Sequence, residues 1–211
     1  MPSRKIPAAI LGGAIAVLSG CSHSTAPAQS SAAPGSTIDD LIVGVEDARR
    51  IAKADGLSSY GDPAVHSPPP PNGNAPEPCQ PVGNNTLTFG TGWTEYRSTT
   101  YHGPLGDRRP GGFAMVNQVS QAVAQYSNRA AALSAFGQLE TALRACHDLH
   151  DPNYPFTLDE PDPSTLRLTA TGWSHLYRAK SAVLVSIGAE GLEFDDRIAS
   201  GLLRMVTDRI R

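Results

Sequence analysis

The sequence predicts an α+β fold, in which helices pack on an antiparallel sheet, and two observations predict it. Apolar residues recur at spacings of three and four near the start, in the middle and at the end of the chain, as they do in helices with one buried face. Between them lie short runs rich in β-branched and aromatic residues, separated by glycine turns, which are typical of strands. Strands bracketed by helices favour this α+β arrangement.

Residues 1–20 have the features of a lipoprotein signal peptide. A basic start precedes an apolar run from Ile6 to Leu18, and Leu18-Ser19-Gly20-Cys21 resembles the bacterial lipobox. The run is too short to cross a bilayer, which takes about 20 apolar residues. We therefore expect Cys21 to be the first mature residue and to carry diacylglycerol and palmitate chains. These would anchor the protein at the extracytoplasmic face of the cell membrane. An ordinary secretory signal with a chance cysteine is the alternative.

Residues 21–36 are predicted to form a lipidated, disordered tether. The segment is mostly serine, alanine, proline and threonine, which cannot bury enough apolar surface to fold. Its hydroxyl groups are candidates for glycosylation. The chain has a formal net charge of −3 and loses two cations with the signal peptide. Nucleic acid is therefore not an expected partner, because its binding proteins carry a basic stripe.

Residues 37–211 are predicted to form one domain, which begins with a helix and a connector. Thr37 and Asp40 have capping-box spacing, and the apolar period that follows predicts a single helix up to about Ala54. Residues 62–81 are rich in proline and are predicted to form an irregular connector that contains Cys79.

The next segments favour strands. Thr86 to Phe89 and Trp93 to Tyr101, on either side of a Gly-Thr-Gly turn, predict a hairpin. For Ala114 to Tyr126 the apolar pattern suits a helix and a strand equally well.

The second half of the chain gives the clearest periodicity. Apolar residues from Ala132 to Cys146 predict a helix that Ser127-Asn128 caps, followed by a loop from Asp148 to Ser164. After that loop we expect three strands, Leu166 to Thr171, Trp173 to Ala179 and Ala182 to Ala189. A closing helix is predicted from Asp195, its N-cap, to Ile210. Its inward residues would be Ile198, Leu202, Met205 and Val206.

The three cysteines divide into one anchor and one pair. With Cys21 lipidated, Cys79 and Cys146 remain in an oxidising compartment, where we expect them to form a disulfide. The closed loop of about 68 residues would stabilise the fold by about 4 kcal/mol. Two free buried thiols are the alternative.

Several motifs occur in a distinctive order: the "LIVGVEDARRI" segment (41–51), Cys79, Gly92-Trp93, Arg97, Tyr101, Gln118-x-x-Gln121-Ala122-Val123-x-x-Tyr126, Ala131-Ala132, Phe136, Leu139 and Cys146. This succession resembles the extracellular sensor domain of mycobacterial PknH-type receptor kinases, a domain that free-standing lipoproteins also carry. The resemblance covers roughly 37–211. It implies a twisted antiparallel sheet flanked by helices with a cleft for an unidentified envelope ligand, and it makes Ala114 to Tyr126 a strand.

The chain departs from these kinases in two ways. They have a second disulfide in the C-terminal half, whereas no cysteine follows Cys146 here. The region from Trp173 to Gly188 is therefore expected to pack differently or to be more mobile. The sequence also contains no kinase domain.

Three stretches carry residues that could serve in catalysis or metal binding. Cys146-His147-Asp148-Leu149-His150-Asp151 holds zinc-type ligands, but the disulfide would use Cys146, and histidines also favour helix C-termini. Ser174-His175 invites a hydrolase interpretation, yet neighbours on a strand point to opposite faces and no Gly-x-Ser-x-Gly motif is present. The acidic run Asp159 to Asp162 lacks the EF-hand spacing. We expect no catalytic residue, metal or cofactor.

Aromatic residues are better candidates for binding, because tryptophan and tyrosine combine a large apolar area with a polar tip. The sequence predicts a non-enzymatic, lipid-anchored protein that binds an envelope ligand or protein partner. A hydrolase or transferase acting on envelope glycolipids is the alternative. The candidates for the cleft are Trp93, Tyr96, Arg97, Tyr101, Tyr126, Trp173 and Tyr177.

Overall fold

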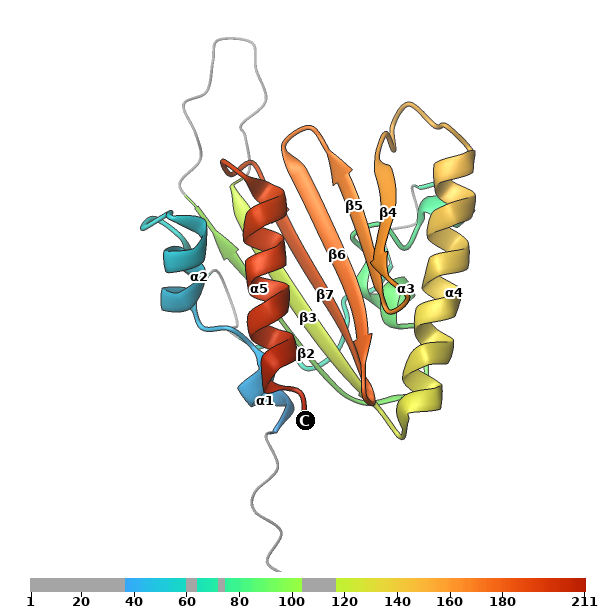
Figure 1. Cartoon of the computed structure of the whole chain (residues 1–211), viewed down its shortest axis with the longest axis horizontal. Helices are drawn as coiled ribbons and strands as arrows, with labels where there is room; N and C mark the ends of the chain where they lie inside the picture. The colour runs from blue at the N-terminus through green and yellow to red at the C-terminus, as the bar shows by residue number, and fades with distance from the viewer. Residues whose placement is uncertain (1–36, 60–63, 72–74, 104–116) are drawn as a thin grey trace, which may run out of the picture. The chain divides into compact units, whose positions relative to one another are not determined.

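The computed structural model describes residues 37–59, 64–71, 75–103 and 117–211. The predictions for the signal peptide, Cys21 and the tether lie outside these residues. The described part contains a seven-stranded, antiparallel sheet in the order β1-β2-β3-β7-β6-β5-β4, with helices packed on both faces (Figure 1). The predicted α+β class is confirmed. No helix in the described ranges is both long and apolar enough to cross a membrane.

The strands lie mainly in the second half of the chain. They are β1 (Ser58–Ser59), β2 (Trp93–His102), β3 (Gln118–Tyr126), β4 (Thr157–Asp162), β5 (Thr165–Ala170), β6 (Trp173–Lys180) and β7 (Val183–Glu190). The helices are α1 (Ile38–Leu41), α2 (Val45–Ala52), the 3₁₀ helix η1 (Glu77–Cys79), α3 (Asn85–Phe89), α4 (Arg129–Asp148) and α5 (Asp195–Arg209).

Most of the predicted elements are confirmed. Of the segment from Ala114 to Tyr126 that the resemblance made a strand, residues 118–126 are a strand, and 114–116 lie outside the described residues. Asn128 caps α4 by accepting a hydrogen bond from the Ala131 amide at 3.0 Å. Two-residue turns join β5 to β6 and β6 to β7. Gly172 and Ser181 adopt positive φ angles of 71° and 52° in these turns, as tight hairpin turns require.

Three predictions for individual elements are wrong. The predicted helix 37–54 is broken into α1 and α2 around Val43. Thr86 to Phe89 is helical, because Asn84 caps α3 through the Leu87 amide, so β2 forms its hairpin with β3 instead. The predicted loop Asp148 to Ser164 contains β4.

The closing helix shows two smaller differences. Asp195 is the first helical residue and not the N-cap, which is Phe194. The Asp195 carboxylate accepts a hydrogen bond from the amide of Leu192, which lies before the helix, at 3.0 Å. Ile198, Leu202 and Val206 are buried as predicted, whereas Met205 is only partly buried.

The two faces of the sheet have separate hydrophobic cores. On one face α5, with α1 and α2, covers aliphatic residues of β3 and β7 such as Val123, Val185 and Ile187 (Figure 1). On the other face α4 packs through Phe136 and Leu143. That second core is richer in aromatic rings, since it includes Phe89, Tyr96, Tyr126, Phe136 and Tyr177.

The predicted disulfide is confirmed. Cys79 at the end of η1 is bonded to Cys146 in the last turn of α4, with the Cα atoms 4.7 Å apart. Both residues are buried. The bond therefore fixes the end of the proline-rich connector to the C-terminal part of α4.

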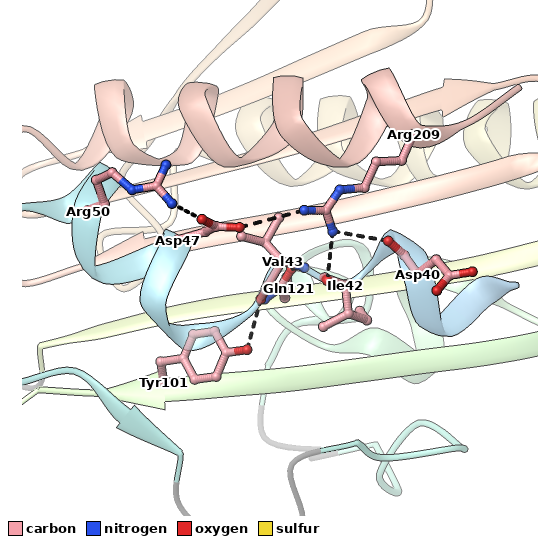
Figure 2. A network of polar contacts seen from close by, with 8 residues as sticks. All are labelled: Asp40, Ile42, Val43, Asp47, Arg50, Tyr101, Gln121 and Arg209. Atoms are coloured by element: carbon pink, nitrogen blue, oxygen red, sulfur yellow. Dashed lines mark hydrogen bonds and ion pairs between the residues drawn. The ribbon is translucent and has the colours of Figure 1, made fainter. Parts of the chain in front are cut away.

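The break between α1 and α2 is held by a polar network, shown in Figure 2. The buried Gln121 amide accepts from the Val43 amide at 2.8 Å and donates to the Val43 carbonyl at 2.6 Å. Tyr101 donates its hydroxyl to the same carbonyl at 2.8 Å. Arg209 from α5 donates to the carbonyls of Asp40 and Ile42 at 3.0 and 2.9 Å. Backbone groups that the broken helix leaves without helical partners are thereby paired.

Candidate functional site

Two adjoining hollows lie near the disulfide on the α4 side of the sheet. The first, which we call the aromatic hollow, has a volume of 320 Å³ and is lined by Tyr154, Phe156 and Trp173 together with Val82, Gly83, Asn153, Pro155 and Ala170. The second, the amide hollow, has a volume of 300 Å³ and includes Gln80, Asn84 and Asn85. Val82, Gly83 and Tyr154 line both, so the two hollows adjoin and together make up the candidate site.

Trp173 is placed in the aromatic hollow by the hairpin of β5 and β6. It is the first residue of β6, opposite Ala170 and directly after the Gly172 turn. Alternate residues of a strand share one face, so Trp173 lies in a row with His175 and Tyr177. The ring centroids in this row are 6.0 Å and 4.5 Å apart. Trp173 thus extends an aromatic row of the core to the surface.

The opposite wall is positioned by the disulfide. The Val82 amide donates to the Cys79 carbonyl at 3.0 Å, in the turn that follows η1. Gly83 then takes a φ of 69°, a left-handed conformation that suits glycine, before Asn84 starts α3. Because Cys79 is bonded to Cys146, this wall is attached to α4 and not only to its own loop.

Tyr154 and Phe156 come from a loop with internal hydrogen bonds. The Asp151 carboxylate accepts from the Asn153 amide at 2.8 Å, and the Tyr154 amide donates to the Asp151 carbonyl at 2.9 Å. The Phe156 ring lies 5.9 Å from the His147 ring in the last turn of α4. The loop therefore presents its two aromatic rings in a defined arrangement.

The site is uncharged. In the described part of the chain neither hollow is lined by an acidic or basic side chain. Beneath it, burial lowers the pKa of His175 to about 4, so its imidazole is neutral at pH 7. Burial also raises the pKa of Tyr177, although the Gly83 amide and the Thr88 hydroxyl oppose the change. Aromatic and amide groups without charge suit a neutral ligand with apolar faces and hydroxyl groups.

Of the predicted cleft residues, Trp173 lines the aromatic hollow. Tyr96, Tyr101, Tyr126 and Tyr177 are at most 4% exposed and pack in the two cores.

The Tyr126 hydroxyl donates to the Phe89 carbonyl at 2.7 Å. Part of Tyr126 also lines a different hollow of 240 Å³ between α3 and α4.

The other two predicted cleft residues lie on β2. Arg97 is ion-paired with Asp39 and donates to the Tyr96 carbonyl at 2.6 Å. Trp93 donates its indole NH to the Gly90 carbonyl at 3.2 Å, and its ring centroid lies 5.8 Å from that of Tyr96. The structure does not bring these two residues to the aromatic hollow, and their binding role stays a prediction.

Tyr154 and Phe156 were not among the predicted cleft residues. They flank Pro155 in a segment that the sequence predicts to be a loop. Two aromatic rings beside a proline in such a loop are the signal that could have pointed to them. Val82 and the amide residues that follow it have no comparable signal.

The serine and histidine of the hydrolase interpretation lie apart. Ser174 faces α5 and its hydroxyl is 3.4 Å from the Asp196 carboxylate, whereas His175 faces the α4 side. His175 instead contacts the Ser186 hydroxyl through Nε2 at 2.8 Å. Within the described residues no carboxylate is hydrogen-bonded to its Nδ1, so the carboxylate of a serine-histidine-acid triad is missing there.

The zinc-type residues at the end of α4 do not converge. The His147 and His150 ring centroids are 6.1 Å apart, and a His150 ring nitrogen lies 2.7 Å from the Asp148 carbonyl. Across the described ranges no group of three histidine, cysteine, aspartate or glutamate residues is placed to hold a metal ion.

Comparisons with known proteins agree with the fold described above. The PknH-like extracellular domain family matches residues 33–209. The crystal structure of the extracellular domain of PknH from Mycobacterium tuberculosis is similar, with a TM-score of 0.61 at 15% sequence identity. The match covers 81% of this chain and 93% of that one. No curated protein matches the sequence. Since the family match spans most of the sequence, the chain belongs to the PknH-like extracellular domain family.

Proposed function

We propose that this protein is a non-enzymatic binding protein of the cell envelope, held at the extracytoplasmic face of the membrane by a lipid on Cys21. Its ligand would sit in the aromatic and amide hollows. The extracellular family supports an extracytoplasmic location. The lipobox before Cys21 supports the lipid anchor.

The aromatic hollow is the observation that carries the binding proposal. Its volume of 320 Å³ is in the range of small-molecule sites, and three aromatic rings converge on it with amide groups close by. An aromatic face packs against the apolar face of a sugar ring, while amides donate to and accept from hydroxyl groups. We therefore infer a neutral, hydroxyl-rich envelope molecule as the ligand class.

The alternative, a hydrolase or transferase that acts on envelope glycolipids, has less support. It needs an activated nucleophile beside the bound ligand. Ser186 and His175 make the hydrogen bond that such a pair requires, but they are 2% and 5% exposed and lie beneath the surface. The site's accessible wall carries amides and aromatic rings instead.

Native mass spectrometry of the full chain, purified in detergent from its own envelope, tests the binding proposal. We expect a co-purifying neutral molecule that is retained by Trp93→Ala and lost from Trp173→Ala. These variants are matched, because they change the only two tryptophans, both partly buried and each at the start of a strand. Circular dichroism confirms that each variant folds. A clean apo mass for the wild type would contradict the small-molecule proposal and leave a protein partner.

The lipid anchor is tested separately. We expect Cys21→Ala to release the protein from the membrane fraction and to remove the lipid mass seen for the wild type. Cys21→Ala protein that stays in the membrane with unchanged lipid content would contradict the anchor without affecting the binding proposal.

A further inference from the structure

A groove lies between α5 and the strands β5 and β6, on the face of the sheet opposite the aromatic hollow. Its volume is 350 Å³. Four cationic residues line it, Arg167 from β5, Arg178 and Lys180 from β6, and Arg204 from α5, together with the carboxylates of Asp162 and Asp208. We call it the arginine groove. The whole chain is slightly acidic, with a formal net charge of −3, so this gathering of cations is not a consequence of composition.

The strand register places three of these cations on one face. Arg178 is opposite Thr165, and Arg167 is opposite Leu176, so Arg167 and Arg178 are diagonal neighbours. Lys180 follows two residues after Arg178 and shares its face. Diagonal cross-strand neighbours lie about 7–8 Å apart, within reach of long side chains. One small anion can therefore contact more than one of them.

The carboxylates around the groove pair with the arginines only at long range. Arg167 lies 3.4 Å from Asp159 and 3.6 Å from Asp196, and Arg178 lies 3.6 Å from Asp162. Well-formed pairs of this kind have N–O distances of about 2.7–2.9 Å. The Nε groups of Arg167 and Arg178 are buried and form no hydrogen bond with any described residue. Each guanidinium therefore has donors that its carboxylates do not use.

Asp162 is held by its own turn more closely than by Arg178. It accepts hydrogen bonds from the Ser164 amide at 2.9 Å, the Ser164 hydroxyl at 2.7 Å and the Thr165 hydroxyl at 3.0 Å. The Lys180 ammonium donates to the Thr207 carbonyl near the end of α5 at 2.6 Å. Arg204 is exposed and forms no ion pair within the described ranges. Arg178 and Arg204 are thus the cations with the most free donor capacity.

We propose that the arginine groove binds an oxyanion of the phosphate class. Guanidinium groups pair with phosphate through two parallel hydrogen bonds, and a phosphate oxygen accepts from several donors at once. Bound between Arg167, Arg178 and Arg204, such an anion replaces the long carboxylate contacts with short ones. It comes either from a lipid headgroup or from a free phosphate ester, since the chemistry recognised is the same.

Phosphorus NMR of the full chain in neutral detergent tests this proposal with two anionic probes, inorganic phosphate and short-chain dihexanoyl phosphatidylglycerol. The zwitterionic dihexanoyl phosphatidylcholine is the control ligand. We expect saturable binding of an anionic probe, weakened about tenfold or more by Arg178→Gln and by Arg167→Gln. Arg144→Gln is the matched control, because Arg144 is a half-exposed, ion-paired arginine of α4, on the other face of the sheet, and does not line the groove.

The pattern of probes identifies the source of the anion. Binding of inorganic phosphate indicates a free phosphate, and binding of the phosphatidylglycerol alone indicates a headgroup; both support the proposal if they depend on the groove arginines. If Arg167→Gln or Arg178→Gln fails to fold, the exposed Arg204→Gln decides, with a weakening of threefold or more expected. The proposal would be overturned if neither anionic probe binds, or if the variants leave the affinity of a bound probe unchanged.

Discussion

The two faces of the sheet differ in the side chains that form their hydrophobic cores. The face covered by α1, α2 and α5 is largely aliphatic, and the Val43 backbone on it is paired by Gln121 and Tyr101 (Figure 2). The face covered by α4 is aromatic and contains buried histidine and serine side chains. A disulfide and an irregular connector complete it, and the hollows lie beside them.

Under the proposed function, this contrast would place membrane attachment on one face and ligand binding on the other. The segment that follows the predicted tether is the one that the polar network holds against the sheet. The α4 face depends instead on a covalent link between a loop and a helix. Loops held in this way can be shaped for a ligand without regular secondary structure.

The largest expected effect comes from removing the disulfide. The variant Cys79→Ala with Cys146→Ala should lose about 3–4 kcal/mol of unfolding free energy, because the unfolded chain is no longer closed into a long loop. Urea unfolding measures this loss. Hydrogen exchange should rise first in η1 and α3, and an equal rise in α1 and α2 would contradict the separation of the faces.

Acid should weaken the α4 face through His175. Its folded pKa is about 4, below the unfolded value near 6.5. The contribution of neutral His175 to the unfolding free energy is therefore fully present above pH 6.5. It is lost as the pH falls towards 4, which lowers the unfolding free energy by up to about 3 kcal/mol. Urea midpoints at pH 7 and pH 4.5 measure the loss.

In His175→Gln the difference in urea midpoint between pH 7 and pH 4.5 should shrink. His147→Gln, a change at a partly exposed histidine, should keep the wild-type difference. A pH dependence that His175→Gln leaves unchanged would exclude His175 as its source.

A smaller effect is expected from Gln121→Leu on the α5 face. The variant leaves the Val43 amide buried without a partner, which costs about 1–3 kcal/mol. Gln125→Leu is the matched control on the same strand, because Gln125 is exposed and should change stability by less than about 0.5 kcal/mol.

Hydrogen exchange would locate the damage. Exchange in Gln121→Leu should rise in α1 and α2 while η1 and α3 keep their protection. Damage centred on η1 and α3 would contradict the assignment of this network to the α5 face.

Elements with local signals could be predicted from the sequence. The helix from 129 to 148 and the hairpins of β5, β6 and β7 follow from apolar period and two-residue turns. Without a second disulfide, β6 and β7 still form a regular hairpin, and β7 is buried along almost its whole length. Strand pairing and packing in both cores hold this region without a second disulfide, and its greater mobility stays a prediction.

Elements that depend on distant contacts could not be predicted. The break after α1 exists because Gln121, 78 residues away, takes the hydrogen bonds of Val43. The strand β4 was missed because its acidic, mostly exposed residues form a sheet edge, which leaves no apolar alternation. Within the site, Trp173 was predictable as an aromatic at the start of a strand. That Trp173 lines one hollow with Tyr154 and Phe156 depends on how the hairpin of β5 and β6 is placed relative to the loop before β4.

Hydrogen exchange of the full chain, measured before and after addition of an extract of its own envelope, tests the central claim most directly. The proposed ligand site on the α4 face predicts new protection at 82–85 and 153–156, with α1 and α2 unchanged. The same protection should be absent in Trp173→Ala. Protection confined to α1, α2 or α5, or no change anywhere, would contradict the claim.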